Sequence, residues 1–337
     1  MKVVELGNTG QKVSQLSLGC MQMGTLTSEE ESRQMLDRYV EQGGNFLDTA
    51  NCYGWFLRRG SHGGESEAVL GRWLAQSGKR GRVFLATKGA AMVRSPDAHW
   101  RAEGEVDWTT ARRDFEGAGR ETLERALEAS LRRLQTDHVD LYYVHVDDRV
   151  TPLDETLEAL ARLVKAGKAR FIGYSNVRTW RLERIRQRCA AEGWPAPVAL
   201  QQQHTYLRRR QGLEHTSIVD DEQLDYLREH PDLTLVAYSP ILKGLYDATA
   251  EKRRGHWAMQ PYLGSDSDAR LAAVAEMARR LDVLPHQLVL AWMLHQRAPR
   301  VVPLVGPRTR EQLEQNLRAV SLELPPELCA ELDRASG

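Results

Sequence analysis

The sequence predicts an α/β protein with a (β/α)8, or TIM, barrel, and three observations support this prediction. Eight short β-rich runs alternate with helical segments along the 337 residues. Most of the runs are continuously apolar, as parallel strands covered on both faces are. The intervening segments have the helical period of apolar residues. A doubly wound open sheet is the alternative, which is disfavoured because G-x-G-x-x-G occurs nowhere in the chain.

Each predicted element follows from its local pattern. The strand runs are residues 16–18, 45–48, 83–87, 141–144, 171–174, 198–201, 234–238 and 301–303. The helical stripes of Leu, Val and Ala cover residues 123–134, 153–164, 271–281 and 313–320. Gly43-Gly44 and Gly167 stand just before strands, where they are expected to end the preceding helices.

Two further features concern the ends of the barrel. Residues 3–6 and 11–13 flank a Gly-Asn-Thr-Gly turn, which predicts a small N-terminal hairpin that caps the bottom of the barrel. Residues 89–119 and 240–266 are too long for plain connections. Because both segments follow strands, we expect them on the carboxyl-terminal face, where barrel active sites form. No repeat, linker or low-complexity segment appears, so we expect one domain over residues 1–337.

The composition excludes several classes of protein. Lys and Arg number 46 and Asp and Glu number 46, so the net charge is zero. This balance argues against a broad surface for nucleic acid but allows a local cationic pocket. The four cysteines form no C-x-x-C pair, so we expect reduced thiols in a cytoplasmic protein. No run reaches the ~20 apolar residues of a membrane span, and the N-terminus lacks a signal layout, so we expect a small-molecule partner and no membrane.

Polar residues end most of the predicted strands, where a barrel directs side chains into its mouth. These residues are Asp48, Lys88, His145, Ser175, Asn176, Gln201 and Tyr238. Tyr53 lies in the loop directly after Asp48. Each alone has a structural explanation, such as a helix cap for Asp48 or a packed aromatic for Tyr53. An Asp, a Lys, a His and a Tyr that converge on one face indicate a shared site.

Together these four groups make a proton donor. A free tyrosine has a pKa of ~10 and holds its proton tightly near neutral pH. We expect the Lys88 ammonium to lower the pKa of Tyr53, and the Asp48 carboxylate to keep that ammonium charged and oriented. His145 can hydrogen-bond a carbonyl oxygen and orient it. The set suits protonation of an alkoxide as it forms, when a carbonyl receives a hydride.

Six segments carry a family pattern, in this order: FLDTANCYG, GGESEAVLG, LATK, DLYYVHVDD, TPLDETLEALARLVKAGKARFIGYSN and VAYSP. With them the chain resembles the aldo-keto reductases over almost its whole length. The resemblance implies a (β/α)8 barrel that binds NADP(H) extended across its mouth without a Rossmann fold. It also implies an oxidoreductase that reduces an aldehyde or ketone to the alcohol by hydride transfer from the nicotinamide.

The resemblance implies a role for each matching residue. Tyr53 is the expected general acid/base, tuned by Lys88 and Asp48. His145 is expected to orient the substrate carbonyl. The residues expected at the nicotinamide and its ribose are Asp48, Gly19, Cys20, Met21, the carboxamide partners Ser175, Asn176 and Gln201, and the stacking Tyr238. Those expected at the pyrophosphate and adenosine are Ser239, Pro240, Leu242, Gly244, Gly306, Arg308, Gln312 and Asn316.

Position 306 bears on the choice of cofactor. Gly306 stands where members with a strong NADP preference often carry Lys, so Arg308 alone is expected to meet the 2′-phosphate or the adenine face. NADP(H) is expected in preference to NAD(H).

Three tryptophans are candidates for the substrate pocket. Trp55 follows Tyr53 by two residues, and Trp100 and Trp108 lie in the long loop after the third strand. Together they could line an apolar pocket. Simple loop packing is the alternative for each.

Two other groups of residues carry less weight. His145 with Asp147 and Asp148 resembles a metal cluster, but neighbours in a strand-to-loop turn point in different directions, so no metal site is expected. Residues 208–210 are three arginines without flanking aromatics at stacking spacing, and they are expected to be a solvated loop.

Three interpretations of the activity stay open. The first is a free NADP(H)-dependent carbonyl reductase. The second is a regulatory NADPH-binding subunit, because the channel-associated β subunits resemble this family and keep the same four residues. The third is an enzyme that works physiologically as a sugar or alcohol dehydrogenase, because the chemistry is reversible. Since the chain starts directly at the predicted hairpin, we expect the free enzyme.

Overall fold

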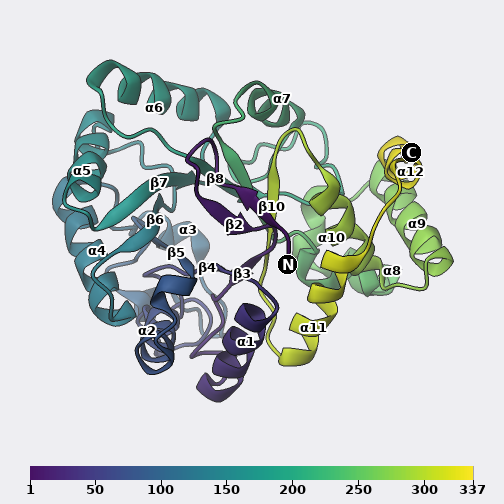
Figure 1. Cartoon of the computed structure of the whole chain (residues 1–337), viewed down its shortest axis with the longest axis horizontal. Helices are drawn as coiled ribbons and strands as arrows, with labels where there is room; N and C mark the ends of the chain where they lie inside the picture. Colours follow the sequence, from purple (N-terminus) through teal and green to yellow (C-terminus); the bar gives the residue numbers. More distant parts are fainter. Residues whose placement is uncertain (337) are drawn as a thin grey trace.

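The computed structural model describes residues 1–336, and its centre is a closed barrel of eight parallel strands (Figure 1). The strands are β3 (Ser17–Gly19), β4 (Phe46–Asp48), β5 (Phe84–Gly89), β6 (Val139–Val144), β7 (Ala169–Ser175), β8 (Ala199–Gln203), β9 (Thr234–Tyr238) and β10 (Val301–Val305). They follow one another in chain order, and β10 pairs with β3 to close the ring. Each predicted run overlaps one strand, so the predicted (β/α)8 barrel is confirmed and the open sheet is wrong.

Helices surround the barrel; most of them connect successive strands, and the last two follow β10 (Figure 1). They are α1 (Glu29–Glu41), α2 (Glu65–Ser77), α4 (Arg120–Leu134), α5 (Leu153–Lys165), α6 (Thr179–Glu192), α7 (Asp221–Glu229), α9 (Ser265–Arg280), α10 (Pro285–His295), α11 (Arg310–Arg318) and α12 (Pro326–Arg334). The four predicted apolar stripes fall on α4, α5, α9 and α11. Helices α2, α6, α7, α10 and α12 have no predicted range; α10 in particular is buried over most of its surface and shows no clear polar face.

A small antiparallel hairpin, β1 (Val3–Glu5) and β2 (Lys12–Ser14), crosses one end of the barrel (Figure 1). Leu6 and Val13 are fully buried in the same cluster as the inward-facing side chains of the barrel. The backbone N–H of Gly7 donates to Thr234 Oγ1 at 2.7 Å, which joins the turn to the start of β9. The predicted hairpin therefore caps the amino-terminal end.

The two long loops leave the carboxyl ends of β5 and β9, as predicted. The first holds a 3-10 turn, Pro96–His99, and the short helix α3 (Trp108–Ala111). The second holds the 3-10 segments Leu242–Asp247 and Trp257–Tyr262 and the short helix α8 (Ala250–Gly255). Over residues 1–336, no helix has the length and apolar character needed to cross a membrane.

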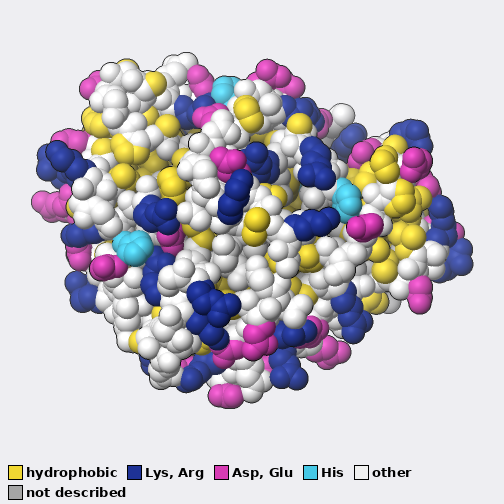
Figure 2. All heavy atoms as spheres, in the orientation of Figure 1, with side chains coloured by type: hydrophobic (Ala, Val, Ile, Leu, Met, Phe, Trp, Pro, Cys, Tyr) yellow, Lys and Arg dark blue, Asp and Glu magenta, His cyan; other side chains and the backbone are white. Residues whose placement is uncertain are grey.

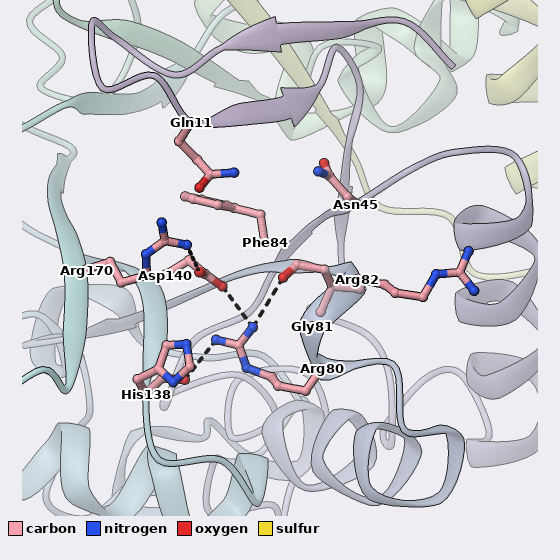
Figure 3. A pocket seen from close by; sticks show the side chains of 10 residues that line it. Gln11, Asn45, Arg80, Gly81, Arg82, Phe84, His138, Asp140 and Arg170 are labelled. Atoms are coloured by element: carbon pink, nitrogen blue, oxygen red, sulfur yellow. Dashed lines mark hydrogen bonds and ion pairs between the residues drawn. The ribbon is translucent and has the colours of Figure 1, made fainter.

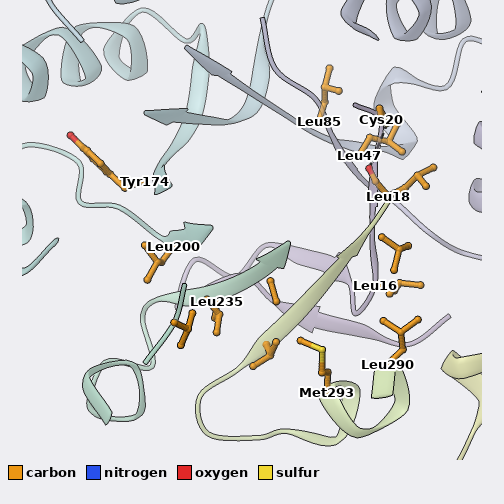
Figure 4. Close-up of a cluster of buried hydrophobic side chains, with 14 of the residues drawn as sticks. Leu16, Leu18, Cys20, Leu47, Leu85, Tyr174, Leu200, Leu235, Leu290 and Met293 are labelled. Carbon is orange, nitrogen blue, oxygen red and sulfur yellow. Dashed lines mark hydrogen bonds between the residues drawn. The ribbon is translucent and has the colours of Figure 1, made fainter. Parts of the chain in front are cut away.

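The core has two layers, because side chains alternate along each strand. Leu18, Leu47 and Leu85 lie in the outer layer, between the strands and the helices (Figure 4). Phe46 and Phe84 face the interior of the barrel, with ring centroids 5.1 Å apart. Continued to the carboxyl ends of the strands, this alternation directs the last inward-facing residues into the mouth.

One glycine makes room for an aromatic ring inside the barrel. A Cβ atom at Gly173 on β7 would lie 2.6 Å from two ring atoms of Tyr143, closer than real Cβ contacts come. Tyr143 is fully buried, and its ring centroid lies 5.8 Å from Lys88 Nζ. Tyr143 therefore forms a floor beneath the Lys88 ammonium, and only glycine at position 173 leaves space for it.

The amino-terminal end of the barrel holds a pocket of about 320 Å³ (Figure 3). Asp140 lines it and is 3% exposed. Its carboxylate forms an ion pair with Arg80 at 3.0 Å and accepts hydrogen bonds from Arg170 at 2.9 Å and from the backbone N–H of Leu85 at 2.8 Å. Figure 2 shows basic and acidic side chains interspersed around the rim of this face. Among the described residues of this lining, Asp140 is the one carboxylate, against the guanidinium groups of Arg80, Arg82 and Arg170, so the lining keeps a net positive charge.

Candidate active site

The four residues singled out as a proton donor lie together at the carboxyl-terminal mouth. Asp48 is the last residue of β4 and Lys88 the last but one of β5; both occupy inward positions and are 1% and 0% exposed. The Lys88 ammonium donates to the Asp48 carboxylate, to the carbonyl oxygen of Thr49 at 2.8 Å and to the Tyr53 hydroxyl at 3.0 Å. Its three protons are therefore all used. The ring of His145 lies edge-to-face with that of Tyr53, with centroids 5.8 Å apart.

The proton on Tyr53 is held more tightly than the sequence analysis expected. Burial raises the pKa of Tyr53 well above its usual value, and the Asp48 carboxylate adds to the rise. The expected lowering by Lys88 is wrong for this structure, because the loss of solvent around the phenol is the larger effect. The phenol stays protonated at neutral pH. Its oxygen accepts a hydrogen bond from Lys88, so this oxygen is prepared for negative charge.

His145 is partly exposed at the mouth and neutral. Burial, and then the charge of Lys88, lower the pKa of His145 well below its usual value. Its backbone is fixed by two hydrogen bonds, from its N–H to the oxygen of Gly89 at 3.0 Å and from Asn176 Nδ2 to its own oxygen at 2.8 Å. Its ring Nδ1 lies 3.4 Å from Cys52 Sγ. No role was predicted for Cys52 from the sequence, although it directly precedes Tyr53.

The residues expected at the nicotinamide lie across the mouth and form a hydrogen-bond network. Gln201 Nε2 donates to Asp48 Oδ2 at 2.8 Å. Asn176 Nδ2 donates to Ser175 Oγ at 3.0 Å, and the Tyr238 hydroxyl donates to Asn176 Oδ1 at 2.9 Å. Asn176 has a φ of 56°, a conformation that Asn tolerates better than most residues. The structure thus brings these four side chains beside the proton donor.

The segment after β3 closes the site from another side. The backbone N–H of Cys20 donates to the oxygen of Asp48 at 2.8 Å, and Cys20 is fully buried between Gly19 and the partly exposed Met21. Burial raises the pKa of the Cys20 thiol. Cys20 is therefore an inert thiol beside Asp48.

The loop after β9 turns sharply over the mouth. Several of its residues have positive φ, namely Ser239, Leu242, Lys243 and Gly244. The loop is fixed by Thr205 Oγ1, which donates to the oxygen of Pro240 at 2.6 Å. This conformation places consecutive backbone groups of the loop at the rim of the barrel.

Lys243 is a cation of this loop that the sequence analysis did not assign to the site. Its ammonium lies 5.2 Å from the ring centroid of Trp257. The surrounding protein and the nearby Arg308 guanidinium lower the pKa of Lys243. The prediction that Arg308 is the only cation in this region is therefore wrong. The position of Lys243 in the long loop after a strand end was the signal that could have identified it.

The residues expected at the adenosine lie on the segment from β10 into α11. Gly306, Arg308 and Gln312 are exposed, and Asn316 is 4% exposed. The backbone N–H of Arg308 donates to Gln312 Oε1 at 2.8 Å, and Thr27 Oγ1 donates to the oxygen of Arg308 at 3.1 Å. The guanidinium of Arg308 is thus carried on a segment tied to the loop before α1.

The three candidate tryptophans gather beside Tyr53. Trp100 Nε1 donates to the oxygen of Trp55 at 3.1 Å. The Trp108 ring lies 5.6 Å from that of Trp55 and 5.5 Å from that of Phe56, and the Phe56 ring lies 6.2 Å from that of Tyr53. Trp108 is 41% exposed. Phe56, which the sequence analysis missed, therefore completes an aromatic surface from Tyr53 to solvent. We call Phe56 and Trp108, with the buried Trp55 behind them, the aromatic wall.

The two weaker signals have structural partners. Asp147 pairs with Arg149 at 2.7 Å, and Asp148 accepts hydrogen bonds from its own turn. In the part of the chain that the structure describes, no group of three or more His, Cys, Asp or Glu could hold a metal ion. In the basic run 208–210, Arg209 pairs with Asp220 at 2.9 Å, while its two neighbours are exposed.

The comparisons with known proteins agree with this geometry. The model of the aldo/keto reductase family matches residues 15–336. The oxidoreductase YrpG of Bacillus subtilis is 34% identical over 333 residues, which cover 97% of this chain and 94% of the relative. The norsolorinic acid reductase stcV of Emericella nidulans is 32% identical over 336 residues, which cover 96% and 78%. The crystal structure of the thermostable aldo-keto reductase Tm1743 with the inhibitor epalrestat matches with a TM-score of 0.71 and 26% identity, over 100% of both chains. The chain belongs to the aldo/keto reductase family of oxidoreductases.

Proposed function

We propose that this protein is an NADP(H)-dependent carbonyl reductase that converts an aldehyde or ketone to the alcohol. One observation carries the proposal. The Lys88 ammonium, fully buried and bound to Asp48, donates its third hydrogen bond to the hydroxyl of Tyr53 at 3.0 Å. A buried tyrosine held in this way is a proton donor whose oxygen can take up negative charge.

The proton transfer needs no acidic phenol. An alkoxide that forms at a reduced carbonyl is far more basic than a phenolate, so Tyr53 can give up its proton despite its raised pKa. As the phenolate develops, its hydrogen bond from Lys88 strengthens, which lowers the energy of the transition state more than that of the ground state. Neutral His145 can donate to the same carbonyl oxygen and orient it. The reduced nicotinamide, when bound, supplies the hydride.

The chemistry of the donor set fits a nicotinamide dinucleotide. Asn176 and Gln201 offer side-chain amides, which complement a carboxamide, and Tyr238 offers an aromatic face. Lys243 and Arg308 add two cations at the rim, which suit phosphate groups. Two cations rather than one support NADP(H) over NAD(H), because the additional phosphate needs additional charge.

The aromatic wall supports a class of substrate. Phe56 packs on Tyr53, and Trp108 carries the surface outward to solvent. We infer that the carbonyl carbon bears an apolar or aromatic substituent, which lies against this wall while the oxygen meets Tyr53 and His145. The four free cysteines support a reducing compartment, the cytoplasm.

A cofactor-oxidation screen tests the proposal. Purified protein is mixed with NADPH and a panel of aliphatic and aromatic aldehydes and ketones, and the loss of reduced-nicotinamide absorbance and the alcohol product are measured. We expect turnover with NADPH, slower turnover with NADH, and higher kcat/KM for aromatic carbonyls. Tight NADPH binding without oxidation across the panel would overturn the reductase and favour a regulatory subunit.

A further inference from the structure

A thiol beside the proposed active site has a contact that the mechanism has not used. Cys52, the residue before Tyr53, is 2% exposed, and its Sγ lies 3.4 Å from Nδ1 of His145. This is the only hydrogen bond of the His145 ring within residues 1–336. The other ring nitrogen, Nε2, is left without a protein partner there.

The protonation states fix the direction of this hydrogen bond. Burial raises the pKa of Cys52 to about 12, although Lys88 lowers it in part, so the thiol keeps its proton at neutral pH. His145 is neutral, so one of its ring nitrogens is a donor and the other an acceptor. A protonated thiol is a weak donor, and an unprotonated imidazole nitrogen is a far better acceptor than sulfur. The S–H therefore points to Nδ1.

We propose that Cys52 is a positioning residue that selects the tautomer of His145. By donating to Nδ1, the thiol places the ring proton on Nε2, the nitrogen free to meet a substrate oxygen. With the opposite tautomer, Nε2 would present a lone pair to that oxygen and repel it. The inference rests on the proposed function, because it assumes that His145 orients a carbonyl.

The other contacts of His145 do not distinguish its two tautomers. The hydrogen bonds from Gly89 and Asn176 hold the backbone of His145, but neither reaches its ring. The Tyr53 ring meets the imidazole edge-to-face at 5.8 Å, which limits rotation without distinguishing the two tautomers. Cys52 is therefore the described side chain that can distinguish them.

Nitrogen-15 NMR of the imidazole groups tests the proposal without any turnover. Long-range proton–nitrogen correlation spectra separate the two tautomers, and the signal of His145 is assigned by its loss in His145→Ala. We expect the Nε2–H form in the wild type, a mixture in Cys52→Ala and recovery of the Nε2–H form in Cys52→Ser, which restores a donor. An unchanged tautomer in Cys52→Ala would overturn the proposal.

Kinetics with NADPH and an aromatic aldehyde give a second readout. We expect Cys52→Ala to lower kcat about tenfold, the scale of one lost hydrogen bond, with the KM for NADPH unchanged and with rescue by Cys52→Ser. In the His145→Ala background, Cys52→Ala should cause no further loss. An equal loss in both backgrounds would show that Cys52 acts through packing and would overturn the proposal. If the wild type reduces no carbonyl, the proposed function fails, while the spectra still decide the tautomer.

Discussion

Each end of the barrel buries an aspartate against at least one cation, and we propose chemistry for only one of the two ends. At the amino-terminal end, Asp140 is bound by Arg80, Arg170 and a backbone N–H. At the mouth, Asp48 is bound by Lys88 and by the amide of Gln201. Both carboxylates are thus satisfied, as buried charges must be. The difference lies in what else the cation contacts.

The cations at the two ends differ in the groups to which they donate hydrogen bonds. The planar guanidinium of Arg80 binds Asp140, two backbone oxygens and a threonine hydroxyl, none of which we expect to exchange a proton in a reaction. Lys88 carries three protons in a tetrahedral array, and one of them reaches the hydroxyl of Tyr53. A buried ion pair becomes a candidate for catalysis when one of its donors reaches a group that can exchange a proton.

The largest expected effect comes from removing that proton. Tyr53→Phe should lower kcat by about 10³-fold or more, at the upper range for a general acid, with NADPH affinity changed only a few-fold. Tyr143→Phe is the matched control, since this second tyrosine lies under the same ammonium and its hydroxyl has no partner within residues 1–336. Single-turnover rates and NADPH titrations measure both. Comparable losses of kcat in Tyr53→Phe and Tyr143→Phe would contradict the role of Tyr53 as the proton donor.

The second effect compares the two cations directly. Lys88→Met should abolish turnover and lower the free energy of unfolding by about 3–5 kcal/mol, because Asp48 stays buried without its counter-ion. Arg170→Met should lower the free energy of unfolding by about 1 kcal/mol or less and leave kcat unchanged. Arg170 is half-exposed, and Asp140 retains its ion pair with Arg80 in this variant. Urea unfolding and kcat measure both. A larger loss of kcat in Arg170→Met than in Lys88→Met would contradict the assignment of the reaction to the mouth.

A smaller effect concerns an exposed charge at each end. Lys243→Met should raise the KM for NADPH about tenfold, the scale of one charge-assisted phosphate contact, and should reduce the dependence of KM on salt. Arg82→Met removes the same charge from the rim of the amino-terminal pocket. It should leave the KM for NADPH and the salt dependence of that KM unchanged. Initial rates at several salt concentrations measure this. Equal shifts in the two variants would mean that only overall charge matters.

The smallest expected effect is the response of the site to pH. Tyr53 loses its proton well above its usual pKa, and His145 gains one well below its own. We therefore expect kcat/KM to stay flat from about pH 6.5 to about pH 9. Below pH 6.5 the unfolded chain binds a proton at His145 that the folded protein does not, so stability should fall as the pH falls. A kcat/KM inflection near neutrality would contradict these protonation states.

The sequence predicted the parts of the site that depend on strand periodicity. Asp48, Lys88 and His145 end apolar runs, and alternation along a strand fixes the side to which each points. The pKa of Tyr53 was predicted in the wrong direction, because it depends on how completely the assembled loops exclude water. Phe56 and Lys243 were missed because loop conformation, not periodicity, places them. The roles of all these residues remain predictions.

The pairing of β10 with β3 has a consequence for the chain while it is being made. The proposed site takes residues from Gly19, at the end of the first barrel strand, to Arg308, which follows the last. Contacts so distant in sequence form slowly, because the chain loses the entropy of closing a long loop before these contacts can stabilise it. Before β10 pairs with β3 the barrel is an open sheet, and Gly306 and Arg308, which follow β10, are not yet beside the mouth. We therefore expect a chain truncated before β10 to lack the assembled cofactor site.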